Sequence, residues 1–234
     1  FIITPNVDFV VRSNKDAEFR EIIAQADLSV CESVIVFNSG ILLGRRFKAK
    51  ITGNDASVML FNLAQERHDR VFLLGSDVST IKLAGEKLAA AYPGMIISGI
   101  HDGYFDLEKS SEIVRQINAS RAKYLFVGMG SPRQEQWVHK HRSELINIRF
   151  IICIGGLFDI FSGKVKRAPL FIQYYGMEWA WRLMHEPRRL WKRYLIYDMS
   201  YFGLLFKEFF HRHPAILKSI LIIPQMILSS DLFF

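Results

Sequence analysis

Continuous apolar runs alternate with helix-like stretches through the first two thirds of the chain. The apolar runs predict strands at residues 1–4, 28–33, 70–74, 95–100, 124–127 and 150–154. The stretches between them predict helices at residues 14–25, 34–43, 56–66, 80–91, 107–120 and 134–142. Runs such as V-F-L-L at residues 71–74 lack polar alternation, which indicates strands buried on both faces. The pattern therefore predicts an α/β fold, a Rossmann-like and mostly parallel sheet covered by helices on both faces.

Glycines follow three of the predicted strands. Gly75 closes the third, Gly128 and Gly130 close the fifth, and Gly155 with Gly156 closes the sixth. Ligands of parallel sheets bind at the carboxyl ends of the strands, where glycine lets backbone amides approach phosphate. A nucleotide-type ligand is therefore expected. No turn spells G-x-G-x-x-G or a P-loop, which argues against a dehydrogenase or an ATPase.

The last third of the chain is basic and aromatic. Residues 164–234 hold eleven Lys or Arg against five Asp or Glu, so about +6 of the net charge of +7 lies there. Residues 177–210 are predicted to be helical, and residues 216–228 are apolar but broken by Lys218 and Pro224. Neither stretch offers the roughly 20 apolar residues of a spanning helix, so helices at a membrane surface are expected.

Composition adds limits to this picture. The chain has 234 residues, of which 50% are hydrophobic and 23% charged, values that exclude intrinsic disorder. Cys31 and Cys153 lie far apart, which excludes a disulfide framework and suits a reducing compartment. Two parts are predicted: a Rossmann-like core at residues 1–163 and a basic, aromatic helical appendage at residues 164–234. Because the chain begins inside a strand and without Met, we expect it to be a fragment.

Short motifs recur along the chain in a distinctive order. They are T-P-N from Thr4, I-T-G-N-D from Ile51, Y-P-G from Tyr92, H-D-G-Y-F from His101, G-M-G-S-P-R-Q-E from Gly128, G-G-L-F-D from Gly155, R-A-P from Arg167, E-W-A-W-R-L from Glu178 and E-P-R-R-L-W-K-R-Y from Glu186. Over roughly residues 1–197, this order and spacing resemble the WecG/TagA/CpsF glycosyltransferase family.

The resemblance implies a reaction and a place in the cell. The family's members transfer a sugar from a UDP-sugar donor to a sugar carried on polyprenyl diphosphate, making teichoic acid, exopolysaccharide and related polymers of the cell envelope. The resemblance implies inversion at the anomeric carbon, a carboxylate base, no cofactor and no metal. It also implies a peripheral enzyme on the cytoplasmic face of the bacterial inner membrane, and a family strand and helix before residue 1.

Three residues are implied to act in catalysis. By motif position Glu32 stands where the family has its catalytic Asp, and Ser33 replaces the glycine that follows. A carboxylate at a strand end can accept the proton of an acceptor hydroxyl, although Glu is one methylene longer than Asp. The same resemblance places Thr4 and Asn6 against the base or the sugar hydroxyls. The competing interpretations are a solvated loop carboxylate for Glu32 and turn chemistry for Thr4 and Asn6.

Further residues are implied to bind the substrates. The implied donor-binding set is Asp102, Gly128, Gly130, Gln134, Asp159, Arg167, Arg182, Arg189 and Arg193. Guanidinium groups bind diphosphate in bidentate fashion and keep their charge, which suits a leaving group neutralised without metal. About two of the four arginines are expected to contact the donor, and a solvated charged face is the competing interpretation.

The expected partners follow from this assignment. They are a UDP-sugar donor, a polyprenyl-diphosphate-linked sugar acceptor and an anionic membrane surface, and a homo-oligomer is left open. No nucleic acid is expected, because the basic segment contains no recognisable recognition module. Because Glu32 and Ser33 depart from the family's Asp-Gly pair, a second function remains open. The chain would then be a catalytically impaired homologue that binds nucleotide or lipid within a polysaccharide-assembly complex.

Overall fold

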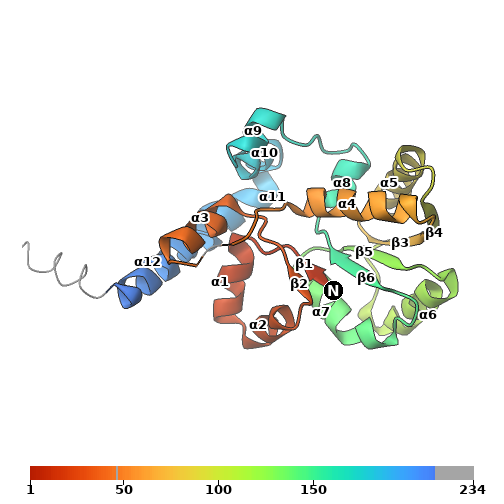
Figure 1. Cartoon of the computed structure of the whole chain (residues 1–234), viewed down its shortest axis with the longest axis horizontal. Helices are drawn as coiled ribbons and strands as arrows, with labels where there is room; N and C mark the ends of the chain where they lie inside the picture. Colours follow the sequence, from red (N-terminus) through yellow and green to blue (C-terminus); the bar gives the residue numbers. More distant parts are fainter. Residues whose placement is uncertain (46, 214–234) are drawn as a thin grey trace, which may run out of the picture.

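The computed structural model describes residues 1–45 and 47–213, and within them it shows one six-stranded sheet (Figure 1). The strands are β1 (Ile2–Ile3), β2 (Leu28–Ser29), β3 (Arg70–Gly75), β4 (Ile96–His101), β5 (Tyr124–Gly128) and β6 (Phe150–Cys153). Their order is β2-β1-β6-β5-β3-β4, and each pairing between these described strands is parallel. The predicted α/β, Rossmann-like sheet is confirmed, with wholly parallel pairing in place of mostly parallel.

Helices connect the strands and form the C-terminal segment. Those of the sheet region are α1 (Val7–Lys15), α2 (Ala17–Ala24), α3 (Val34–Leu42), α4 (Gly53–Glu66), α5 (Val78–Ala91), α6 (Ser110–Ser120), α7 (Arg133–His141) and α8 (Leu157–Phe161), with short 3-10 turns η1 (Leu107–Lys109) and η2 (Arg142–Glu144). Those of the C-terminal segment are α9 (Leu170–Tyr174), α10 (Glu178–His185), α11 (Pro187–Lys192), the π-helical turn η3 (Arg193–Tyr197) and α12 (Ser200–Arg212).

Two apolar layers sandwich the sheet (Figure 1). Along β3, Phe72 and Leu74 pack into the layer that includes side chains of α1, α2, α6 and α7. Val71 and Leu73 point the other way, into the layer with α4, α5 and α8. The same alternation runs along β5 and β6. Because both faces of β3, β5 and β6 are buried, these central strands need apolar residues at nearly every position, which explains their continuous apolar runs.

The first helices differ from the prediction, which had one helix at residues 14–25. A helix already begins at Val7, because the Asn6 side chain caps it by accepting a hydrogen bond from the Phe9 amide at 3.4 Å. Asp16 then caps α2 through the Phe19 amide at 2.9 Å, so two short helices replace the predicted one. Helices α8 and α9 also form where the apolar pattern predicted none.

The C-terminal segment is helical, as predicted, but it is divided. The stretch predicted at residues 177–210 breaks before Pro187, which occupies the first turn of α11, where a residue without an N–H is tolerated. The predicted helix at residues 216–228 lies outside the described residues. None of the helices in residues 1–45 and 47–213 is long and apolar enough to cross a membrane.

Glycines bring the loops at the carboxyl ends of β3, β4 and β5 close together. Gly75 has φ +147°, and a Cβ built on it would collide with the Gly128 backbone. A Cβ on Gly103 would come within 2.9 Å of the Gly75 Cα atom. The edge of the sheet is therefore packed backbone against backbone, and a side chain at Gly75 would push its loops apart.

We expect Gly75→Ala to lower the free energy of unfolding by about 2–4 kcal/mol, because the backbone is strained for an L-residue and the methyl group has no room. Urea unfolding measures the change. The matched control is Gly203→Ala in α12, where a Cβ meets nothing within 4 Å and alanine is the better helix former. Equal stability of the Gly75 variant and the wild type would contradict this account of the sheet edge.

Candidate active site

A large pocket of about 980 Å³ lies at the carboxyl edge of the described sheet. Residues at or just after each strand end line it: Thr4, Glu32, Ser76, Tyr104, Gly128 and Gly155. The C-terminal segment supplies the facing wall: Glu178, Trp179, Arg182, Glu186, Arg189, Arg193, Tyr194, Asp198 and Phe202. The sheet and the C-terminal segment therefore build this pocket jointly.

Most residues singled out from the sequence meet in this pocket. They are Thr4, Asn6, Glu32, Gly128, Gly130, Gln134, Asp159, Arg182, Arg189 and Arg193. Two predicted donor contacts, Asp102 and Arg167, are not among its lining residues. The Asp102 carboxylate accepts a hydrogen bond from the Tyr104 amide at 2.9 Å and so shapes the loop after β4.

The Arg167 guanidinium pairs with carboxylates of two other elements. Its guanidinium donates to Asp55 Oδ1 at 2.9 Å and lies 3.7 Å from Glu178 Oε1. Asp55 belongs to α4 and Glu178 to α10, so Arg167 ties the C-terminal segment to the sheet region. The R-A-P arginine therefore helps to hold the pocket wall, and its contact with the donor stays a prediction.

Glu32 lies in the loop between β2 and α3, beside cationic side chains. Burial raises the pKa of its carboxyl, and the nearby Glu178 carboxylate adds to the rise. Arg182 and Arg193 act in the opposite direction by favouring the charged form. A carboxylate with a raised pKa, held beside fixed positive charge, is a stronger proton acceptor than a solvated one.

Thr4 and Asn6 flank Glu32 at the end of β1. Thr4 is buried and contacts the start of α4, where a Cβ on Gly53 would lie 3.4 Å from Thr4 Oγ1. The side-chain Oδ1 of Asn6 caps α1, which is the structural role considered for this residue. Asn6 also lines the pocket.

Gln134 is buried and braces two loops of the pocket floor. Its Oε1 accepts a hydrogen bond from the Gly155 amide at 3.0 Å, and its Nε2 donates to Glu135 Oε1 at 2.6 Å. Burial raises the pKa of the Glu135 carboxyl. These bonds join the start of α7 to the turn after β6, so Gln134 fixes the relative position of the two glycine turns that the sequence pattern assigned to phosphate.

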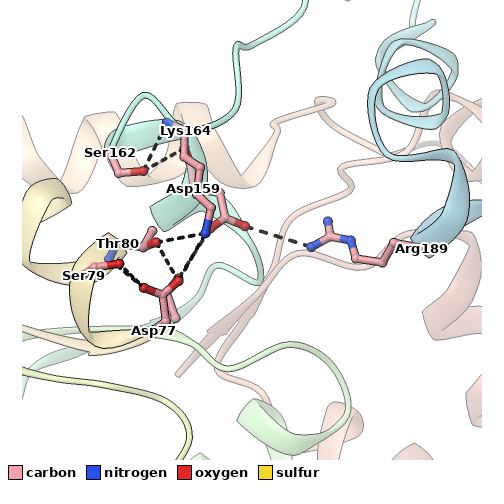
Figure 2. Close-up of polar contacts among 8 residues, drawn as sticks. Asp77, Ser79, Thr80, Asp159, Ser162, Lys164 and Arg189 are labelled. Atoms are coloured by element: carbon pink, nitrogen blue, oxygen red, sulfur yellow. Dashed lines mark hydrogen bonds and ion pairs between the residues drawn. The ribbon is translucent and has the colours of Figure 1, made fainter.

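Several cationic side chains face the pocket, and some are paired with carboxylates (Figure 2). Lys164 Nζ lies 3.3 Å from Asp77 Oδ2, at the cap of α5. Arg189 contacts Glu186 at 2.8 Å and lies 4.0 Å from Asp159 Oδ2.

The remaining pocket cations differ in pairing. Arg193 lies 4.0 Å from Asp8 Oδ2. Among the described residues, neither Lys50 nor Arg182 has a carboxylate oxygen within 4.0 Å. These two cations are therefore the ones whose charge is least compensated, and they are the natural positions for an anionic ligand.

Sequence reasoning missed both pocket lysines. Lys50 pairs its backbone with Cys31 in an isolated β-bridge, which brings it next to Glu32 in space. Nothing in the surrounding sequence marks it, because the bridge depends on tertiary structure. Lys164 lies three positions before the R-A-P motif, and this position was the only available signal.

A charged cluster docks the C-terminal segment on α1. Asp8 contacts Arg12 at 3.3 Å and also faces Arg193 of η3. Burial raises the pKa of the neighbouring Asp198 carboxyl to about 6, and Asp8 adds to the rise while Arg193 opposes it. The cluster fixes where Arg193 enters the pocket.

Within the part of the chain that the structure describes, no three His, Cys, Asp or Glu side chains are grouped to hold a metal ion.

Comparison with known proteins agrees with the motifs and the pocket. The model of the glycosyl transferase WecG/TagA/CpsF family matches residues 1–215. Three similar proteins carry the name N-acetylglucosaminyldiphosphoundecaprenol N-acetyl-beta-D-mannosaminyltransferase. The one from Bacillus spizizenii is 32% identical, with 83% of this chain and 74% of the relative covered. Those from Bacillus subtilis and Staphylococcus aureus are 31% and 30% identical, with 83% and 81% of this chain and 74% of each relative covered. This chain therefore belongs to the WecG/TagA/CpsF family of glycosyl transferases.

Proposed function

We propose that this chain transfers an N-acetylhexosamine from a UDP-sugar to a sugar carried on polyprenyl diphosphate, with inversion at the anomeric carbon, in the synthesis of a cell-surface polysaccharide. The observation that carries the proposal is Glu32 in one pocket with Lys50, Arg182 and Arg193. A base beside a cationic subsite is what sugar transfer from a nucleoside diphosphate requires. The relatives' names, which specify a diphosphoundecaprenol acceptor, support the substrate class.

The geometry supports a direct displacement. Glu32 takes the proton of the acceptor hydroxyl as that oxygen attacks the anomeric carbon, and the bond from that carbon to the diphosphate oxygen breaks. UDP leaves with added negative charge, which Lys50 and Arg182 neutralise. Arg193, held by Asp8, adds further positive charge near Glu32. Thr4 and Asn6 orient the acceptor sugar.

The donor rests on the other half of the pocket. The turns at Gly128–Gly130 and Gly155–Gly156 form the floor of this half and let the nucleotide approach the backbone closely, and Gln134 holds the two turns in register through the Gly155 amide. Asp159 and Arg189 face the donor from the far side. Residues 164–234 act as the donor-binding and membrane-associating part of an enzyme attached peripherally to the cytoplasmic face of the membrane.

For the base, we expect Glu32→Gln to lower kcat by roughly 10² to 10⁴ with little change in UDP affinity, since it removes the proton acceptor and keeps the size. The wild-type rate should fall with acidity through a pKa above the usual 4.5 of Glu, because only the ionised carboxyl is a base and burial raises this pKa. Steady-state kinetics between pH 4 and 9 measure both. Full turnover in Glu32→Gln would remove Glu32 from the mechanism. It would also contradict the impaired-homologue interpretation, which rests on the substitution at this position.

For the cationic subsite, we expect Arg182→Gln to weaken UDP binding by about 10- to 100-fold, as loss of a charge-assisted contact to phosphate would. It should also move the acid limb of the rate to higher pH, because Arg182 holds the Glu32 pKa down. Calorimetric titration with UDP and the pH profile report the two effects. Arg188→Gln is the matched control, since Arg188 is exposed, belongs to α11 and does not line the pocket. Equal behaviour of the two variants would refute the assignment.

For the leaving group, we expect turnover to persist in EDTA, because Lys50 and Arg182 supply the positive charge that a divalent cation would otherwise supply. The measurement is UDP release before and after chelation, with Mg²⁺ added back. Loss of activity on chelation and its return with Mg²⁺ would contradict the assignment of that role to side chains.

A further inference from the structure

A second, smaller cavity opens beside the active-site pocket, between α3 and α12. It has a volume of about 280 Å³ and is lined by Leu42 of α3 and by Phe202, Leu205, Phe206 and Phe209 of α12. We call it the α3–α12 slot. Its lining consists of apolar side chains alone, whereas the active-site pocket carries many charged groups. A site of this kind selects hydrocarbon over any polar ligand.

The slot adjoins the active-site pocket. Phe202 lines both cavities. Helix α3 also joins them: Val34 and Ile35 at its start line the pocket next to Glu32, and Leu42 at its end lines the slot. Leu42 lies eight positions after Val34, which corresponds to about 12 Å along the helix axis. A ligand with its polar head beside Glu32 would therefore meet the slot with the next part of its length.

The two helices that form the slot lie side by side (Figure 1). Tyr201 of α12 is buried, and this burial raises the pKa of its hydroxyl, while the Ser39 hydroxyl of α3 acts in the opposite direction. Helix α3 has the sequence V-I-V-F-N-S-G-I-L, with apolar residues on nearly every side. Leu42 at the end of this helix is nevertheless 51% exposed. Packing within the fold does not account for such an exposed apolar surface, which is typical of a binding site.

We propose that the α3–α12 slot binds the first isoprene units of the acceptor's polyprenyl chain. The inference rests on the proposed function and deepens it, because it assigns the lipid part of the acceptor to a site in the protein. The adjacency of the two cavities indicates the occupant. Hydrocarbon in the slot would be attached to a head group in the neighbouring pocket, which is rich in cations. A polyprenyl diphosphate sugar has this composition, with diphosphate between sugar and hydrocarbon.

The experiment compares two soluble acceptor analogues in buffer without membranes. They are N-acetylglucosaminyl diphosphate esters of methyl and of geranyl alcohol, and calorimetry measures their dissociation constants for the full chain in the presence of UDP. We expect the geranyl ester to bind at least about tenfold more tightly, since its hydrocarbon enters the slot. Leu42→Trp fills the slot and should remove this preference while leaving the methyl ester's affinity unchanged.

Ile41→Trp is the matched control. Ile41 is adjacent on the same helix and also 51% exposed, but it does not line the slot. It should keep the geranyl preference. Equal affinity of the two esters for the wild type would overturn the proposal, and so would equal loss of the preference in both Trp variants. The proposal would also be overturned if the full chain showed no geranyl preference but a variant ending at His213 did. In that case residues 214–234 would compete for the slot and be its occupant.

Turnover of the same esters tests the proposed function separately. A wild type that prefers the geranyl ester in binding, with the preference lost in Leu42→Trp, supports the slot whether or not sugar is transferred. Failure to transfer sugar from any UDP-sugar to either ester would count against the proposed function alone. Transfer to both esters with identical kcat/KM and identical dissociation constants would uphold the function and overturn the slot.

Discussion

The burial of both faces of the parallel sheet is the constraint on which the rest of this structure depends. Side chains of β3, β5 and β6 face an apolar layer whichever way they point, so no polar group can act from within a strand. Chemistry is confined to the residues that follow each strand. The pocket consequently collects Thr4, Glu32 and Ser76 from separate strand ends, and its floor depends on glycine where backbones meet.

The sheet edge alone supplies few of the positive charges that the reaction needs. Arg182, Arg189 and Arg193 come from the C-terminal segment, which therefore completes the site. That segment is fastened by polar contacts at several points, among them Arg167 to Asp55, Arg193 to Asp8 and Lys164 to Asp77. Many of its apolar side chains are exposed, while Leu190 and Tyr201 are buried.

How much the sequence predicted depended on whether the signal was local. Buried strands and the glycine turns after them are local patterns, and the sheet was predicted well from them. Helix α1 was missed because its apolar face is short and its start depends on the Asn6 cap. Lys50 was missed because its position depends on a bridge to Cys31. Arg167 carried a strong motif, yet its partner Asp55 lies 112 residues away and could not be identified from spacing.

The paired cations of the pocket have a consequence for the binding of anions. Arg189 and Lys164 hold carboxylates in the structure, namely Glu186 and Asp77. A diphosphate that contacts these cations must compete with partners attached to the same protein, which are always present at high local concentration. Ion pairing within the protein therefore weakens the binding of any anion at these two cations, for a diphosphate donor and a diphosphate product alike.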